Sequence, residues 1–165
     1  MTKSAALALL ATIACTSAHA ADPKGAWFNE DKDGIIQVID CGGTLCGSVV
    51  WLKDPLDPAT GKPPVDKKNT DPAQRSRPIL GLQVVSGMKP SSSTGKWDGR
   101  IYSIDDGKSF DGNLILKGDN EMRVQGCILL ICQGETWTRT TLPAAAPSGV
   151  APARPAASPS PQRAR

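Results

Sequence analysis

Tight-turn signals divide the middle of this 165-residue chain into short segments, and this division constrains the fold more than any other feature. The signals combine glycine with aspartate, asparagine or a second glycine, at Asp33-Gly34, Gly42-Gly43, Asp106-Gly107 and Gly118-Asp119-Asn120. Between them apolar and polar residues alternate in places, and no stretch has the period of an amphipathic helix. This pattern is typical of β-strands joined by tight turns.

Eight short strands are predicted between residues 21 and 142, which form one predicted domain. Their ranges are 25–29, 35–41, 44–52, 80–86, 96–103, 109–117, 121–127 and 131–140. Strands that follow one another through tight turns pair in antiparallel order, and closing them into a barrel removes exposed edges. The sequence therefore predicts an all-β fold, a small antiparallel up-and-down barrel of about eight strands.

One connection is much longer than the others, because residues 53–78 contain six prolines and no strand pattern. Loops of this length are usually functional or disordered. Four polar residues in it are candidate ligand-binding residues: Asp66, Asn69, Arg75 and Arg77. Two interpretations stay open, a solvated lid with surface charges and a loop that folds over the barrel mouth and offers its two arginines to an anionic group.

Residues 1–20 have the features of a secretory signal peptide. Lys3 supplies the positive charge, residues 5–14 are almost entirely apolar, and Ala18-His19-Ala20 has small residues at both recognition positions. The apolar run is too short to span a bilayer. We expect cleavage after Ala20 and a periplasmic or secreted protein; the alternative is a lipoprotein modified at Cys15.

His19 is the only histidine, so cleavage after Ala20 leaves a mature chain without one. This excludes a Ser–His–Asp triad, a histidine general base and imidazole metal ligands. Asp31, Asp33 and Gly34 resemble the start of a calcium loop, but no acidic residue stands at its twelfth position. We expect no enzymatic activity, no cofactor and no metal site. An enzyme that works through carboxylates and arginines stays as an alternative.

Four cysteines remain after cleavage, in two pairs with four residues between the members of each: Cys41 and Cys46, and Cys127 and Cys132. Three disulfide pairings are open to four cysteines, and spacing does not choose among them. We favour two local bridges, because each pair flanks residues that can form a turn. Zinc sites and redox-active pairs usually use a tighter Cys-x-x-Cys spacing, so both are weaker alternatives.

Residues 143–165 consist mostly of alanine, proline and serine and include three arginines. Such a segment cannot bury a core, so we expect a disordered basic tail. The predicted domain has 15 basic and 16 acidic residues, and the formal charge of the whole chain is only +3. We therefore expect no nucleic-acid partner, and at most a weak contact between the tail and an anionic envelope surface.

Gly25-Ala26-Trp27 on the first predicted strand resembles the Gly-x-Trp signature of lipocalins and related calycin barrels. In those folds the tryptophan plugs one end of the barrel and packs under an arginine from near the last strand. The resemblance implies that Trp27 and Arg139 form this pair at the end of the barrel.

Several further stretches resemble a family of small secreted bacterial proteins, the domain of unknown function 2147, which has a lipocalin-like barrel. They are Cys41-Gly42-Gly43-Thr44-Leu45-Cys46-Gly47, Val49-Val50-Trp51-Leu52-Lys53, Asp66-Lys67-Lys68-Asn69, Arg75-Ser76-Arg77-Pro78, Ile101-Tyr102, Asp106-Gly107-Lys108 and Thr136-Trp137-Thr138-Arg139. The resemblance covers nearly all of residues 25–140. It implies the fold and brings no established activity.

The aromatic residues Trp51 and Tyr102 adjoin these stretches, so we place both near the mouth of the barrel as candidate ligand-binding residues. The leading hypothesis is a binding barrel for a small apolar or amphipathic molecule, with an anionic group as a further ligand type. The alternative is an envelope-associated structural or interaction protein that has no small-molecule ligand. The sequence does not tell whether side chains fill the barrel.

Overall fold

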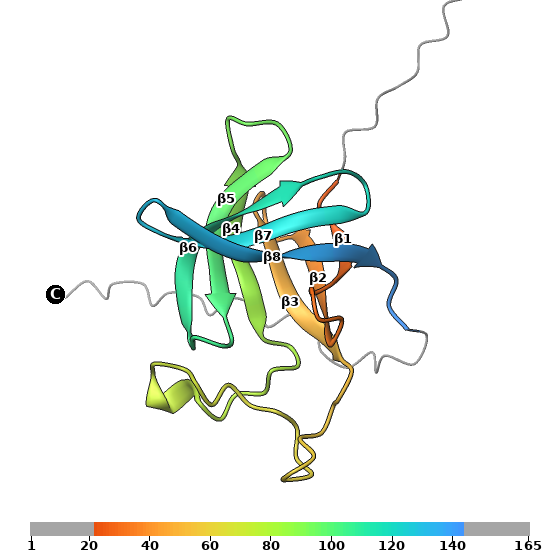
Figure 1. The fold of residues 1–165 in the computed structure, drawn as a ribbon, viewed down its shortest axis with the longest axis vertical. Helices are drawn as coiled ribbons and strands as arrows, with labels where there is room; N and C mark the ends of the chain where they lie inside the picture. The colour runs from red at the N-terminus through yellow and green to blue at the C-terminus, as the bar shows by residue number, and fades with distance from the viewer. Residues whose placement is uncertain (1–21, 144–165) are drawn as a thin grey trace, which may run out of the picture.

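The computed structural model describes residues 22–143, and these residues form a closed barrel of eight strands in chain order (Figure 1). The predicted signal peptide, and the predicted tail beyond Pro143, lie outside the described residues. The strands are β1 (Gly25–Phe28), β2 (Gly34–Asp40), β3 (Leu45–Leu52), β4 (Gln83–Pro90), β5 (Lys96–Ser103), β6 (Lys108–Leu116), β7 (Glu121–Ile128) and β8 (Ile131–Thr140).

Every strand pairs with its neighbours in antiparallel orientation, and β1 pairs with β8 to close the barrel. The closing register sets Trp27 opposite Arg139. Without this pairing, β1 and β8 would be the two exposed edge strands of the sheet. The predictions of an all-β fold and of eight antiparallel strands in an up-and-down barrel are confirmed.

Seven strands lie within one residue of their predicted ends, and the fourth does not. We predicted residues 80–86, whereas β4 begins at Gln83 and continues to Pro90. Residues before Gln83 turn instead, because Gly81 has a positive φ of 88° and Leu82 N–H donates to Ile79. Beyond Ser86 the pairing with β5 shifts its register, and this irregularity hides the strand pattern in the sequence.

One half of the barrel is filled by its own side chains. Five residues of this half are fully buried: Trp27, Val38, Met88, Leu114 and Met122. They come from β1, β2, β4, β6 and β7, so the packed end draws on strands from around the barrel. Close packing here leaves this end closed.

Trp27 and Arg139 cap the closed end as the resemblance implies. The Arg139 guanidinium lies over the Trp27 ring at 4.2 Å from its centroid, and the Trp27 indole donates to Pro23 O at 2.8 Å. Arg139 also donates to the backbone carbonyls of Asp22, Lys24 and Asp119. A Cβ on Gly25 would lie 2.8 Å from Arg139 Nη1, so glycine is needed where the arginine passes. The contacts join the N-terminal segment to the β6–β7 turn.

Both disulfides are local, which confirms the favoured pairing. Cys41–Cys46 bridges the β2–β3 turn, and Cys127–Cys132 bridges the β7–β8 hairpin. Each pair links two strands that already adjoin, so the disulfides pin hairpins and do not tie distant parts of the barrel together.

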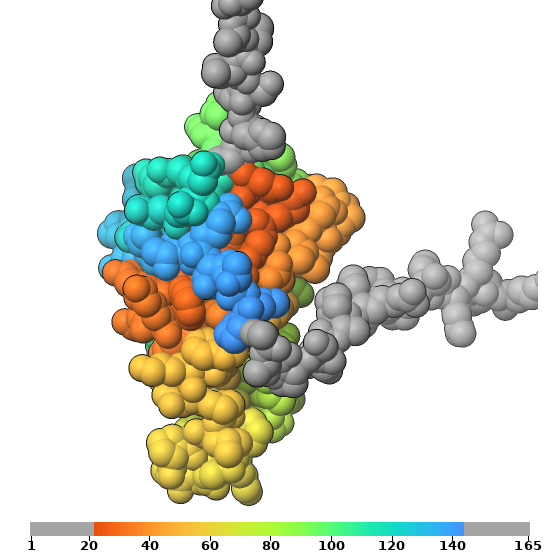
Figure 2. Space-filling view, turned by 90° about the vertical axis from the view of Figure 1, so that its right-hand side faces the viewer, coloured from red at the N-terminus to blue at the C-terminus, as the bar shows by residue number. Residues whose placement is uncertain are grey.

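The long connection between β3 and β4 extends beyond the barrel at the end opposite Trp27 and Arg139. It appears in yellow and yellow-green at the bottom of Figures 1 and 2. Its ordered features are a 3-10 turn at Pro72–Gln74 and an isolated bridge between Val65 and Pro78. Asp71 caps this turn by accepting a hydrogen bond from Ala73 N–H. The connection is therefore folded on itself through local hydrogen bonds.

Candidate functional site

A cavity of about 1220 Å³ opens at the end of the barrel that carries the long connection. Strand alternation points a set of apolar and aromatic side chains into it from β2 to β8. The wall includes Ile36, Val49, Val84, Ile101, Phe110, Val124 and Trp137, and Pro64 and Ile79 of the connection contribute to it. The five fully buried residues of the closed end are not among the described residues that line it. The barrel is thus plugged at one end and open at the other.

Polar groups concentrate around the mouth of this cavity, in the turns that follow β1, β3 and β5. The charged residues there are Asp31, Asp33, Asp54, Asp105, Asp106 and Lys108. Some of them have partners: Asp105 pairs with Lys68 at 3.1 Å, and Asp106 accepts a hydrogen bond from Ser103 Oγ at 2.8 Å. Acidic groups outnumber basic ones, so the mouth carries a net negative charge.

Glu135 places a carboxylate on the barrel wall itself. It stands opposite Val124 on β7 and two residues before Trp137 on β8, so all three side chains share the inner face. Glu135 is half-buried, and its Oε1 accepts a hydrogen bond of 2.6 Å from the Trp137 indole. Within the described residues, Glu135 forms no ion pair with a lysine or arginine.

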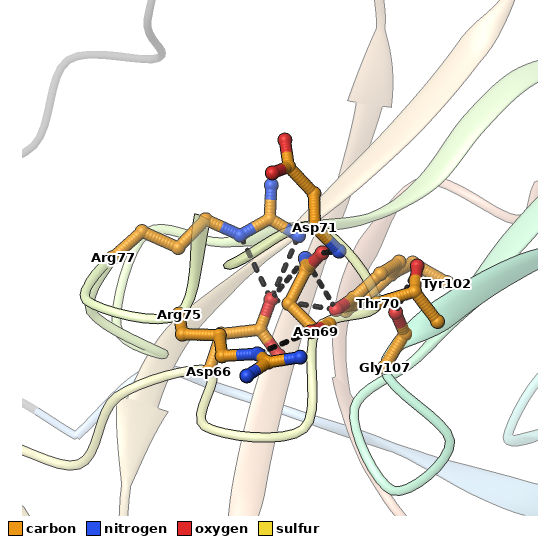
Figure 3. A network of polar contacts seen from close by, with 8 residues as sticks. All are labelled: Asp66, Asn69, Thr70, Asp71, Arg75, Arg77, Tyr102 and Gly107. Carbon is orange, nitrogen blue, oxygen red and sulfur yellow. Dashed lines mark hydrogen bonds and ion pairs between the residues drawn. The ribbon is translucent and has the colours of Figure 1, made fainter. Parts of the chain in front are cut away.

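A second polar cluster lies beside the cavity, where the long connection meets β5 (Figure 3). At its centre is Asp66, whose side chain is fully buried. Its Oδ2 accepts hydrogen bonds from Tyr102 Oη at 2.6 Å, Asn69 Nδ2 at 2.8 Å and Arg77 Nε at 2.9 Å. Arg77 Nη2 also lies 2.9 Å from this oxygen, and the guanidinium stacks over the Tyr102 ring at 4.9 Å.

The contacts of this cluster set the charge states of its members. Burial acts to raise the pKa of Asp66, but hydrogen bonds from Asn69, Tyr102 and Arg77 outweigh it, so the pKa lies below the ordinary value of 3.8. Burial and the hydrogen bond to Asp66 raise the pKa of Tyr102. Asp66 is therefore ionised and Tyr102 protonated at neutral pH, which is the arrangement that the donors and acceptor need.

Backbone hydrogen bonds extend the cluster to the β5–β6 turn. Thr70 N–H donates to Gly107 O at 3.0 Å, and Arg75 Nε donates to Asn69 O at 2.8 Å. Gly107 has a positive φ of 66°, and a Cβ there would lie 1.8 Å from Lys68 O. Only glycine permits this close approach of two backbones. The cluster therefore fastens the long connection to the barrel beside the mouth.

The six predicted ligand-binding residues separate into three groups. Tyr102 lines the cavity. Asp66, Asn69, Arg75 and Arg77 hold the connection together, with both arginines bonded to the loop itself. Trp51 packs edge-to-face on Phe28, with ring centroids 5.9 Å apart, and these two are not among the described residues that line the cavity. Ligand binding by these residues stays a prediction.

Sequence reasoning missed Glu135, although a signal for it was present. Trp137 is a large aromatic residue within the predicted strand 131–140, and a residue two positions earlier on the same strand shares its face. A carboxylate at that position is unusual for an interior wall. The alternation of Glu135 with Trp137 could therefore have identified it.

The profile of a bacterial family described as "Uncharacterized protein conserved in bacteria (DUF2147)" matches residues 25–139. The chain belongs to the DUF2147 family. The match spans the whole barrel, from the strand that carries Trp27 to the arginine that covers it. The family that the sequence motifs resemble is thus confirmed.

The DUF2147 barrel is also similar in fold to a solved structure from Helicobacter pylori, described as "Protein HP1028 from the human pathogen Helicobacter pylori belongs to the lipocalin family". The TM-score is 0.60 at 16% sequence identity, over 73% of this chain and 84% of that one. The likeness shows a lipocalin-like fold. A comparison with curated proteins found no match. No helix within residues 22–143 is long and apolar enough to cross a membrane.

Proposed function

We propose that this DUF2147 protein is a binding barrel that holds a small apolar or amphipathic molecule in the cavity at its open end. One observation carries the proposal: the barrel keeps an apolar-walled space of about 1220 Å³ instead of filling it with side chains. An eight-stranded barrel is just wide enough either to be filled or to hold one small ligand. Here the closed half is filled and the open half is hollow.

The form of the cavity supports a ligand of at least ordinary metabolite size. Small-molecule sites are typically about 300–1,000 Å³ and mostly apolar, with a few polar groups that orient the ligand. This cavity exceeds that range and has apolar walls, with polar groups mainly at the mouth. A ligand would therefore bury an apolar body in the barrel and keep a polar part near the turns.

We also propose that the protein works in the periplasm or outside the cell and is not an enzyme. Two disulfides support an oxidising compartment. The predicted signal peptide supports export, and cleavage after Ala20 would leave no histidine for general acid–base catalysis. A carrier or sensor of a small molecule needs neither a nucleophile nor a base.

The test is a fluorescence titration with the neutral apolar probe N-phenyl-1-naphthylamine. We expect the wild-type protein to bind the probe and to enhance its emission. Val124→Phe adds volume to the cavity wall, so it should weaken probe binding about tenfold or more. Gln125→Phe introduces phenylalanine at the next residue of β7, which is not among the described residues that line the cavity, and should leave binding unchanged.

Two results would contradict the proposal. One is a folded wild-type protein that binds neither this probe nor any competing amphiphile. The other is an equal loss of binding in Val124→Phe and Gln125→Phe, because the probe would then not occupy the cavity.

A further inference from the structure

We propose that the ligand of this barrel is an amphipathic cation, whose positive group is recognised by Glu135 and the acidic mouth while its apolar part fills the cavity. This inference rests on the proposed binding function and adds the chemical class of the ligand. It begins from Glu135, a half-buried carboxylate on an otherwise largely apolar wall. Charged groups in such surroundings are normally paired, because removal from water is costly.

Glu135 has a neutral donor and no cationic partner among the described residues. Trp137 Nε1 donates to its Oε1 and thereby fixes the carboxylate on the wall. A carboxylate accepts several hydrogen bonds, so Glu135 keeps capacity for a ligand. An ammonium or guanidinium group supplies both the missing charge and the missing donors.

The acidic residues at the mouth add to the preference of Glu135 for a cationic group. Five aspartates and one lysine line it, and the Lys108 ammonium stacks over the Phe110 ring at 5.2 Å. Apolar walls of low dielectric constant focus the field of these carboxylates into the cavity. Three aromatic residues also line it, Tyr102, Phe110 and Trp137, and their rings attract cations. Anionic amphiphiles meet repulsion at the same place.

Arg75 and Arg77, which were predicted to bind an anionic group, do not offset the negative charge at the mouth. Arg77 is paired with the buried Asp66, and Arg75 donates to the backbone of Asn69. Lys108 is the one basic residue among the described residues that line the cavity. The site is therefore built for a positive charge.

The experiment compares three amphiphiles with the same chain, dodecyltrimethylammonium, dodecyl maltoside and dodecyl sulfate, below their micellar concentrations. Each competes with N-phenyl-1-naphthylamine for the purified protein at low and at high salt. We expect the ammonium compound to displace the probe at concentrations at least about tenfold lower than the sulfate does. Added salt should reduce this difference.

Glu135→Gln tests the named residue, because glutamine keeps an acceptor for the Trp137 indole and removes only the charge. It should reduce the advantage of the ammonium compound about tenfold and leave dodecyl maltoside unaffected. Glu121→Gln is the matched control, since it makes the same change at the exposed start of β7, outside the cavity lining. It should behave as the wild type.

The outcomes separate this inference from the proposed function. If dodecyl maltoside displaces the probe but the ammonium compound has no advantage, the barrel binds ligands and the cation inference is wrong. The inference also falls if Glu135→Gln and Glu121→Gln act alike. If neither the probe nor any of the three amphiphiles binds, the proposed function itself fails.

The β7–β8 hairpin carries a second inference, which concerns its tip at residues 128–131, on the rim of the same cavity. We propose that this tip inserts into a lipid surface. Its four aliphatic residues are unusually exposed to solvent, with exposed fractions of 60% for Ile128, 96% for Leu129, 98% for Leu130 and 70% for Ile131. The hairpin projects sideways from the barrel in Figure 1, and Cys127–Cys132 staples its base.

The residues at the tip are not those usually found in a tight hairpin turn, which favours a role in lipid insertion. Leu129 has a positive φ of 53°, a conformation in which glycine or asparagine is usual. A fully exposed leucine in that position costs conformational energy and gains no burial within the barrel. Residues 124–134 include no charged side chain, so nothing charged accompanies the tip into an apolar phase.

A lipid surface fits the tip better than a protein partner does. Stable protein interfaces use about 20–30 residues on each side, whereas this convex tip offers four. The strand ladder extends to the Ile128–Ile131 pair, so most of the tip backbone is hydrogen-bonded, as a bilayer requires. The acidic mouth nearby favours neutral over anionic lipids.

Co-sedimentation with phosphatidylcholine vesicles, with and without phosphatidylglycerol, tests this inference. Leu129→Gly/Leu130→Ser should still fold, because glycine followed by serine suits a two-residue hairpin turn with a positive first φ. It should lower partitioning at least about tenfold. Leu56→Ser, an exposed leucine on the long connection, should have no effect.

Equal sedimentation of the wild type and the double variant would overturn the inference. So would a dimer of the wild type in size-exclusion chromatography that the double variant abolishes, because a second copy would then cover the tip.

Discussion

Asp66 is the residue that joins the long connection to the barrel wall. One of its two carboxylate oxygens, Oδ2, accepts hydrogen bonds from Asn69 and Arg77 on the connection and from Tyr102 on β5. Because the side chain is fully buried, each of these donors depends on the negative charge remaining in place. The position of the connection beside the mouth thus depends on one ionised group.

Asp66→Asn should lower the free energy of unfolding by about 3 kcal/mol, because it removes the charge that compensates the partly buried Arg77. Urea unfolding monitored by tryptophan fluorescence measures this change. Asp111→Asn removes a carboxylate that also pairs with an arginine, Arg100, but is 85% exposed. That control should change stability little. Similar losses in both variants would contradict the assigned role.

Acidification should reproduce the effect of Asp66→Asn in the wild-type protein. Since the folded-state pKa of Asp66 lies below 3.8, the unfolded chain binds this proton more readily. The stabilisation is therefore fully present well above pH 3.8 and is lost as the pH falls through the folded-state pKa. Urea unfolding measured across this range should give a shallower pH dependence for Asp66→Asn. An identical slope in both proteins would contradict this assignment.

The resemblance to the family and the composition of the long connection identified the members of this cluster as candidate site residues, but not their contacts with one another. Asp66, Asn69 and Arg77 belong to two separate stretches of a connection that has no periodic pattern. Tyr102 lies on a distant strand. A loop without a periodic pattern gives no indication of how it folds. The sequence therefore did not show that Arg77 forms an ion pair with Asp66 instead of binding a ligand. By contrast, strand alternation could have predicted that Glu135 lies on the same face of its strand as Trp137.

Strands and hairpins were the most predictable elements, because period-2 alternation and Gly-containing turns act locally. β5 and β8 have their predicted ends. β4 was misplaced because Gly81 and Leu82 continue the loop and a register shift follows Ser86. The local disulfides agree with this view, since each one links two strands that follow one another in the sequence.

Removal of either disulfide should weaken the barrel without changing its topology. Each bridge closes a loop with a sequence separation of five, so Cys127→Ser/Cys132→Ser should cost about 2 kcal/mol, and Cys41→Ser/Cys46→Ser about the same. Urea unfolding gives the stability, and far-ultraviolet circular dichroism checks that the strands remain. Loss of the native spectrum in either variant would contradict a purely local role.

The barrel as a whole is asymmetric along its axis, and this property was beyond sequence reasoning. Trp27 and Arg139 close one end through contacts between the first and last strands, which the Gly-x-Trp resemblance implied. Whether the other end is hollow depends on the summed volume of inward side chains from seven strands. Small changes in register alter that volume, so only the assembled fold reveals the cavity.

Native mass spectrometry tests the central claim, that the open end holds a small molecule, most directly. The protein is purified without detergent from cells that produce it naturally, and its mass is compared before and after extraction with organic solvent. We expect a discrete added mass that extraction removes and that the Val124→Phe variant lacks. A bare polypeptide mass in every gentle preparation, together with no uptake of added amphiphiles, would contradict the account.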